Sequence, residues 1–296
     1  MNNIKRGILY EVFSYVFWGI MPVYWRILGF AAPFRILGAR ICFALLFTAL
    51  ALLLRGNKTW ISLLSGSPAG SSQKQVQSTN SRRLTILSGI VISLNWGSYI
   101  WAVNTGHTIE ASLGYYINPL VSVLLAMIFL RERLSVLQWV AFGFAALGVF
   151  LVTLFSGVFP WISLLLAFTF GFYGLIKKKI NAGSLEALGA ETLAALPLGL
   201  ALLIFPIDGL IAINTISQWL LLLSSGIVTA LPLYTFAQGA KLLPLTTVGF
   251  LQFITPTMLF FLGIFVFGEA FPPNKLWAFG CIWIAVGLYC ISPRKK

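Results

Sequence analysis

Apolar runs of roughly 20 residues recur along almost the whole chain, and a helix of about that length is needed to cross about 30 Å of hydrocarbon. Charged residues make up 9% of the chain and hydrophobic residues 59%, whereas about 25% of a typical soluble domain is charged. A water-soluble fold is therefore excluded. We predict an all-α integral membrane protein with ten transmembrane helices. The predicted spans are 8–28, 34–54, 84–104, 111–130, 135–155, 159–176, 185–205, 216–238, 245–267 and 274–291.

Lysine and arginine residues collect on one side of these spans. Because the number of spans is even, both termini lie on one side, together with 16 of the 20 basic residues; three lie opposite and Arg40 lies inside a span. Cytoplasmic loops carry the positive excess, so both termini are predicted to be cytoplasmic in a bacterial inner membrane. The basic residues occupy short loops rather than one polar face, so the net charge of +13 predicts no nucleic-acid partner. The polar stretch within 55–83 is predicted to be a mobile cytoplasmic loop.

Short motifs recur in the two halves of the chain in the same order. Segment 116–119 aligns with 253–256, and segment 37–40 aligns with 188–191. Collinear matches of this kind indicate an internal duplication. Five spans per copy is an odd number, so the second copy is inverted in the membrane. We predict a first five-helix repeat at 1–156 and a second at 157–296, an architecture that transporters use to expose one midplane site to either side.

Several short segments spread along the chain also resemble those of a known family. They are 99–104, 106–107, 110–120, 171–174, 191–192, 228–232, 243–245 and 249–252. In these segments the chain resembles the RarD group of EamA-type permeases, which belongs to the drug/metabolite transporter superfamily. The resemblance implies ten helices, of which one to four and six to nine surround a central cavity and five and ten support it. It also implies export or exchange of small metabolites or drugs.

Polar and aromatic residues recur every three or four positions on several spans. Residues that repeat in this way within an apolar helix face something other than lipid. We expect them to line a cavity that offers aromatic faces and neutral hydrogen-bonding groups, without a fixed charge at its centre, to a partly apolar solute such as a metabolite, an amino-acid-like compound or a drug. The alternative is that they only join neighbouring helices. The predicted substrate-binding residues are Trp18, Asn95, Tyr99, Tyr115, Asn118, Ser122, Tyr173, Gln252 and Thr255.

Arg40 and Glu191 are charges about two turns inside their spans, at equivalent repeat positions. A charge at the bilayer centre costs at least ~2.5–3.5 kcal/mol, so both are expected to face protein or water. Glu191 is a candidate for proton coupling because loss of water disfavours a charged carboxylate. Arg40 is a candidate for attracting an anionic solute, and structural anchoring is the alternative for both. Glu11 is expected to reach the cytoplasmic interface, and Lys177 is expected to be a topology anchor.

Three prolines inside predicted spans, Pro119, Pro232 and Pro256, are hinge candidates. Each removes a backbone donor and leaves a carbonyl one turn back unpaired. Packing kinks are the alternative interpretation of these prolines.

The residues that intramembrane catalysis requires are scarce. The chain has one His and one Asp, which leaves no paired aspartates and no His-Glu metal motif, and it has no Gly-rich phosphate loop. We therefore predict a secondary transporter rather than an enzyme, with a small-molecule substrate and no metal or cofactor. A channel, or a flippase for a lipid-linked substrate, is the alternative on the same fold. Coupling to a proton and assembly into a homo-oligomer are left open.

Overall fold

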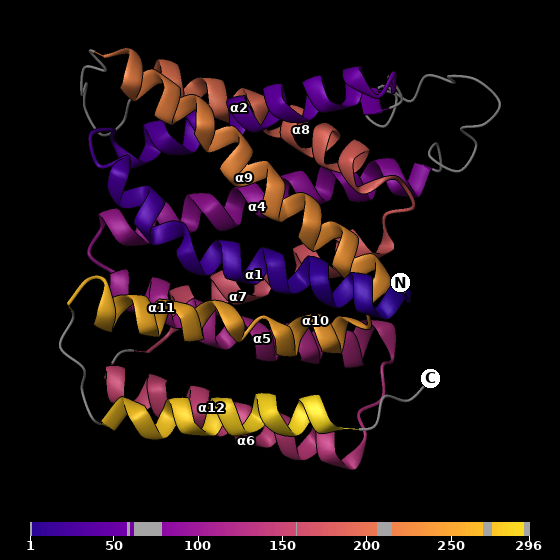
Figure 1. Ribbon diagram of the computed structural model, residues 1–296, viewed down its shortest axis with the longest axis vertical. Helices are drawn as coiled ribbons and strands as arrows, with labels where there is room; N and C mark the ends of the chain where they lie inside the picture. The colour runs from indigo at the N-terminus through magenta and orange to yellow at the C-terminus, as the bar shows by residue number, and fades with distance from the viewer. Residues whose placement is uncertain are drawn as a thin grey trace.

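The computed structural model describes residues 2–57, 60–61, 79–157, 159–205, 215–268 and 274–292. Within these residues the chain forms helices and no strand, and the helices lie side by side in one bundle (Figure 1). The predicted mobile loop at 55–83 lies largely outside the described residues. The main helices are α1 (Asn3–Ile27), α2 (Pro33–Leu54), α4 (Thr79–Asn104), α5 (Thr108–Leu130), α6 (Val136–Ser156), α7 (Trp161–Lys179), α8 (Ser184–Ile204), α9 (Ile216–Leu242), α10 (Leu245–Leu251), α11 (Ile254–Phe265) and α12 (Asn274–Ile291).

Eight segments of the described chain are long and apolar enough to cross a membrane, with α10 and α11 together counted as one. Helix α1 is less apolar because it carries Glu11, three tyrosines and two tryptophans. The apolar part of α12, Leu276–Ile291, is shorter than the others. The protein is therefore a multi-pass membrane protein, and every predicted span falls on a helix of the bundle.

Local sequence signals set the ends of several helices. At the start of α6, Ser135 Oγ accepts a hydrogen bond from the Gln138 amide at 3.3 Å, and Gln138 Oε1 accepts one from the Ser135 amide at 2.9 Å. This reciprocal capping box satisfies two amides that have no partner within the helix. Gly157 ends α6 with φ of 68°, a left-handed conformation that glycine adopts without steric cost.

Helices of the first half pack on helices of the second half in exchanged pairs. In the first such exchange, α1 of the first half packs on α9 of the second half, and α7 of the second half packs on α4 of the first half. In the second, α2 packs on α9, and α8 packs on α4. Three further pairs, α2 with α8, α5 with α10 and α6 with α12, join helices that are equivalent in the two halves. This pattern is the one that a pseudo-two-fold relation between the halves would produce. Helix α1 begins and α12 ends at the same end of the bundle (Figure 1).

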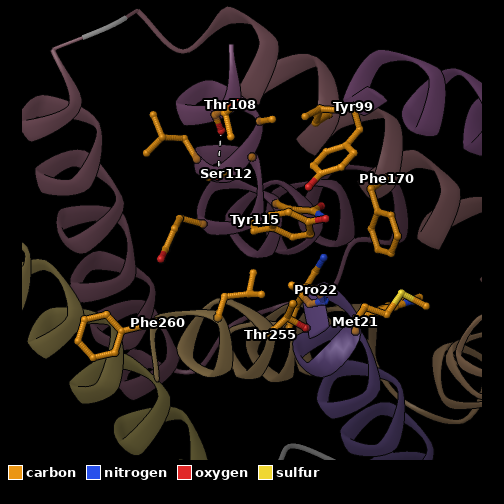
Figure 2. Close-up of a pocket in the computed structure, with 18 of the residues that line it drawn as sticks. Met21, Pro22, Tyr99, Thr108, Ser112, Tyr115, Phe170, Thr255 and Phe260 are labelled. Atoms are coloured by element: carbon orange, nitrogen blue, oxygen red, sulfur yellow. Dashed lines mark hydrogen bonds between the residues drawn. The ribbon is translucent and has the colours of Figure 1, made fainter. Parts of the chain in front are cut away.

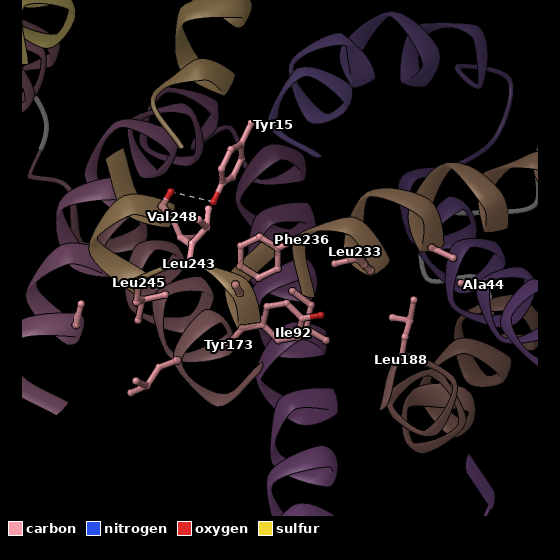
Figure 3. Packing of buried hydrophobic residues seen from close by; sticks show 14 residues of the cluster. Tyr15, Ala44, Ile92, Tyr173, Leu188, Leu233, Phe236, Leu243, Leu245 and Val248 are labelled. Carbon is pink, nitrogen blue, oxygen red and sulfur yellow. Dashed lines mark hydrogen bonds between the residues drawn. The ribbon is translucent and has the colours of Figure 1, made fainter. Parts of the chain in front are cut away.

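A cluster of buried side chains lies where α1, α7, α9 and α10 meet, with further members on α2, α4, α5 and α8 (Figure 3). The end of α9 and the start of α10 lie at the end of the bundle that carries the termini (Figure 1). The rings of Tyr173 and Phe236 stack with centroids 5.9 Å apart. The Tyr15 hydroxyl donates a hydrogen bond to the Val248 carbonyl at 3.2 Å, which ties α1 to α10. Leu245 packs into the same cluster. We call this group the sealed-half cluster, because its side chains are buried against one another at that end.

Candidate functional site

A cavity of ≈ 730 Å³ lies between helices of the two halves. Its wall extends from Tyr15 and Trp18 in the middle of α1 to Thr108, Ser156 and Phe267, which lie at helix ends away from the chain termini. Sites for small molecules usually have volumes of about 300–1,000 Å³. The cavity therefore reaches one end of the bundle and stops at the sealed-half cluster.

Most of the predicted substrate-binding residues meet at this cavity. The rings of Tyr99 and Tyr115 lie edge to face with centroids 6.0 Å apart. Figure 2 shows these rings beside each other, with Thr255, Met21 and Pro22 below them in that view. The predicted residues that line the cavity are Trp18, Asn95, Tyr99, Tyr115, Asn118, Gln252 and Thr255.

Two predicted residues, Ser122 and Tyr173, are not part of the cavity wall. Ser122 lies behind it, where its hydroxyl donates a hydrogen bond to Gln252 Oε1 at 3.2 Å. Tyr173 is fully buried in the sealed-half cluster against Phe236. Tyr173 follows the wall residues Leu166 and Phe170 at helical spacing on α7, but helical periodicity does not indicate how deep along a helix the cavity extends.

The polar groups of the wall are mostly fixed by the protein itself. Asn95 Nδ2 donates hydrogen bonds to the Leu166 carbonyl at 2.9 Å and to Thr169 Oγ1 at 2.8 Å. Thr255 Oγ1 donates one to the Tyr15 carbonyl at 2.9 Å. Asn118 Oδ1 is buried and has no hydrogen-bond partner among the described residues. Because an unsatisfied buried acceptor is unfavourable, Asn118 has an unused capacity to bind a donor of a solute.

The ninth predicted span is discontinuous beside the cavity. Helix α10 ends at Leu251 and α11 begins at Ile254. Pro256 has no amide hydrogen to donate to the Gln252 carbonyl, which instead accepts a hydrogen bond from the Thr255 amide at 3.2 Å. The interruption therefore places Gln252 and Thr255 at the cavity wall. The other two hinge candidates, Pro119 and Pro232, lie inside the continuous helices α5 and α9.

Arg40 brings a positive charge to the cavity wall. Its guanidinium carbon lies 4.6 Å from the ring centroid of Trp25 and 4.9 Å from that of Trp96, and its Nε donates a hydrogen bond to Thr229 Oγ1 at 3.1 Å. The cavity was predicted to have no fixed charge at its centre, and the structure adds a charge at its wall. Two indole faces from different helices attract the guanidinium, so the charge can lie at the wall without an acidic neighbour among the described residues.

Glu191, at the repeat position equivalent to Arg40, lies outside the cavity wall. It forms an ion pair with Lys177 at 2.7 Å, and the two side chains are only 2% and 1% exposed. Ser88 Oγ also donates a hydrogen bond to Glu191 Oε1, and the Tyr173 hydroxyl donates one to Oε2 at 3.4 Å. Lys177, which was expected to be a topology anchor, is enclosed by the bundle in the last turn of α7.

Glu11 is fully buried, which contradicts the expectation that it reaches the interface. Helix α9 covers it, and Gly239 permits this close approach because a Cβ atom there would lie 2.5 Å from Glu11 Oε1. Neither carboxyl oxygen has a hydrogen-bond partner among the described residues. Tyr15 and Lys178 are the groups that interact with Glu11 electrostatically.

Charged side chains also tie helices together in the sealed half, Glu132 between the two repeats and Lys178 within the second repeat. The carboxylate of Glu132, just after α5, accepts hydrogen bonds from the amides of Leu245 and Thr246 at 2.8 and 2.9 Å. Lys178 Nζ donates hydrogen bonds to the Leu243 carbonyl and, at 3.3 Å, to the Ala240 carbonyl. Sequence reasoning missed both contacts because charges beside helix ends are usually solvated.

Comparison with known proteins adds evidence from their sequences. The model of the EamA-like transporter family matches residues 5–154 and again 159–292. "Uncharacterized transporter YojE" of Bacillus subtilis is 42% identical, over 98% of this chain and 95% of that protein. "Protein RarD" of Streptomyces exfoliatus is 40% identical, over 96% and 88%, and "Protein RarD" of Escherichia coli K12 is 35% identical, over 98% and 96%. One crystal structure has a TM-score of 0.70, with 18% identity and 96% of both chains covered, which supports the fold alone.

Proposed function

Because this chain belongs to the EamA-like transporter family and is similar to RarD-type permeases, we propose that it carries small organic solutes across a bacterial inner membrane by alternating access. The observation that carries this proposal is the cavity between the two repeats, which reaches one end of the bundle and is closed at the other by the sealed-half cluster. A cavity with access from one side is one of the two states that alternating access requires.

The proposed topology has ten transmembrane helices, with the second five-helix repeat inverted relative to the first. The exchanged helix pairs and the shared end of the termini support this arrangement. The excess of basic residues on the side of the termini supports cytoplasmic termini. In this orientation the cavity opens to the outer side, and the sealed half faces the cytoplasm.

The change of access requires the sealed-half contacts to break and the open end to close. The discontinuity between α10 and α11 next to Pro256 is the proposed hinge, because a short break in the backbone ladder absorbs bending at low cost. Pro119 and Pro232 are secondary candidates, since each removes one hydrogen bond from a continuous helix.

For proton coupling we propose Glu11 rather than Glu191. Glu191 is held in an ion pair with Lys177, so its charge is already balanced. Glu11 is buried without a hydrogen-bond partner among the described residues, and burial of this kind favours the neutral, protonated carboxyl. Opening of the sealed half would expose Glu11 to water and allow it to release the proton. Tyr15 and Lys178 are the titratable groups that face it.

Solute exchange by the purified protein tests the proposed function. Proteoliposomes are loaded with a metabolite extract of a bacterial cell, and released solutes are identified by mass spectrometry. We expect release of a restricted set of solutes at a rate that saturates with concentration. Asn118→Ala and Gln252→Ala should slow release, because both side chains lie at the cavity wall. The matched control Gln218→Ala, at the start of α9 and outside the wall, should leave it unchanged.

The outcome of this assay also separates the competing functions. A release rate that rises linearly with concentration, without saturation, would indicate a channel. Transfer of a lipid-linked compound between leaflets, without release of soluble solutes, would indicate a flippase. No protein-dependent movement of any compound would contradict transport altogether.

A further inference from the structure

The cavity wall contains one charge among the residues that the structure describes, that of Arg40. The remaining described wall residues are aromatic, apolar or neutral polar, including Trp18, Tyr115, Phe170 and Phe260. A solute in the cavity therefore meets one fixed cation beside several aromatic faces. This combination selects for the charge of the solute as well as for its shape.

The donors of Arg40 are used only in part. A guanidinium carries five N–H donors in a planar fork that fits a carboxylate or a phosphate. In the described structure one of them, on Nε, is bonded to Thr229, and no acid pairs with the group. The indoles of Trp25 and Trp96 hold the fork in place through its faces. Such a fork is prepared for an anionic partner that the described residues do not supply.

Closure of the open end would bury the Arg40 charge. The sealed half shows how this bundle buries a charge, because Glu191 is enclosed there only with Lys177 at 2.7 Å. Enclosing an unpaired charge is strongly unfavourable, whereas an ion pair with good geometry offsets most of that cost. The partner that would permit closure over Arg40 therefore has to arrive with the solute.

We propose that the transported solute is an organic anion, a carboxylate on an aromatic or apolar body. Its carboxylate pairs with the Arg40 fork between Trp25 and Trp96, and its body lies against the aromatic wall. This proposal rests on the proposed transport function and names the substrate class of the same cavity. Arg26 supports it at the mouth, where its guanidinium lies 5.4 Å from the ring centroid of Phe267, a wall residue, and attracts anions toward the opening.

Three probes that share a phenylpropyl body and differ in charge test the proposal on the purified full-length protein. They are 3-phenylpropionate, 3-phenylpropionamide and 3-phenylpropylamine, and binding is measured as the rise in Tm with probe concentration. We expect the anion to reach half-saturation at a concentration about tenfold lower than the amide, because it adds a charged hydrogen-bonded contact. The amine should bind more weakly than the amide, since Arg40 repels it.

Variants of Arg40 assign the preference to this residue. Arg40→Gln should remove the tenfold preference for the anion while still binding the amide. Arg40→Lys should keep part of the preference, because the charge remains but the planar fork is lost. The control Arg55→Gln removes an exposed arginine just after the same helix, and it should bind the anion as well as the wild type does.

Several results would overturn the proposal. They are equal or tighter binding of the amide or the amine by the wild type, no stabilisation by any of the three probes, or an undiminished anion preference in Arg40→Gln. If Arg40→Gln does not fold, the same comparison is made on Arg40→Lys, where an undiminished preference counts against the planar fork. Saturable exchange of neutral or cationic solutes alone would overturn the anion assignment and leave transport intact. Anion binding without any solute exchange would contradict transport instead.

Discussion

The two halves of the bundle hold their intramembrane charges in opposite ways. The alignment of the two halves of the sequence sets Arg40 against Glu191. Glu191 lies in the sealed half, 2% exposed and paired with Lys177. Arg40 lies in the open half, at the cavity wall, between two indole rings and without an acidic partner among the described residues. One of the two aligned positions therefore carries a buried ion pair in the sealed half, and the other carries an unpaired charge at the cavity wall.

This difference separates a structural role from a binding role. A buried ion pair satisfies itself and leaves nothing for a ligand, while an unpaired guanidinium at a cavity wall keeps most of its donors available. The comparison makes quantitative predictions, because loss of a partner inside the sealed half should cost much more stability than loss of the charge at the wall. Each variant below changes one side of the comparison, beginning with the largest expected effect on stability.

Breaking the ion pair should have the largest effect. Lys177→Met leaves the buried Glu191 carboxylate without its partner, and loss of one member of a buried pair costs about 3–5 kcal/mol. We expect a large fall in Tm in detergent and a low yield of folded protein. The control Lys179→Met removes an exposed lysine from the same turn of α7 and should have little effect. An equal Tm for Lys177→Met and Lys179→Met would contradict the structural role of the pair.

The double variant Lys177→Met/Glu191→Gln sharpens this result. It removes both charges together, and replacement of a complete buried pair by neutral groups is often close to neutral for stability. We expect it to recover most of the stability lost in Lys177→Met. If it were as unstable as the single variant, packing of the lysine stem rather than charge pairing would account for the loss.

Removal of the Arg40 charge should have a smaller effect on stability. Arg40→Met forfeits one hydrogen bond to Thr229, worth about 0.5–1.5 kcal/mol, and two cation–π contacts worth about 0.5–1 kcal/mol each. Methionine in the cavity recovers part of this through apolar contact, so we expect a net cost of roughly 1–2 kcal/mol. The free energy of unfolding in detergent measures it, with Arg55→Met as control. A cost as large as that of Lys177→Met would remove the distinction between the two positions.

The sequence predicts the properties of single segments, but it does not predict contacts between side chains of different helices. Hydrophobic runs and short motifs identified the multi-pass membrane class and the family, because both are properties of single segments. The faces of α4 and α5 that line the cavity followed from helical periodicity. The surroundings of Arg40, Glu191 and Glu11 did not, because they depend on side chains from other helices: Trp96 on α4, Lys177 on α7 and Gly239 on α9. Depth and charge pairing are tertiary properties, and a single helix does not encode them.

A substitution at Glu132, which contacts the start of α10, should have a small effect on the stability of the sealed half. Glu132→Gln keeps an acceptor for one amide but removes the negative charge beside the start of α10. A negative charge at the start of a helix stabilises it by about 0.3–1 kcal/mol. We expect the sealed half to open more often, by a factor of up to about five. A cysteine at the buried position Val248, in a chain whose three native cysteines are replaced by alanine, reports opening through its rate of maleimide labelling. The control is Arg133→Gln, and equal rates in both variants would contradict a sealing role for Glu132.

Glu11 distinguishes burial from pairing, because it is buried like Glu191 and unpaired like Arg40. Glu11→Gln preserves the shape of a neutral carboxyl but adds one buried amide hydrogen, so we expect the free energy of unfolding at neutral pH to fall by only about 1 kcal/mol. A glutamine cannot release a proton. Accumulation of solute driven by a pH gradient in proteoliposomes should therefore disappear, while solute exchange without a gradient continues.

The control Glu186→Gln changes a carboxyl that is bonded to Asn57 and should preserve both activities. Gradient-driven accumulation that persists in Glu11→Gln would place proton coupling elsewhere. A large loss of stability would instead show that Glu11 is charged and balanced by Lys178. The buried carboxyl of Glu11 would then be paired with a lysine, as the carboxyl of Glu191 is.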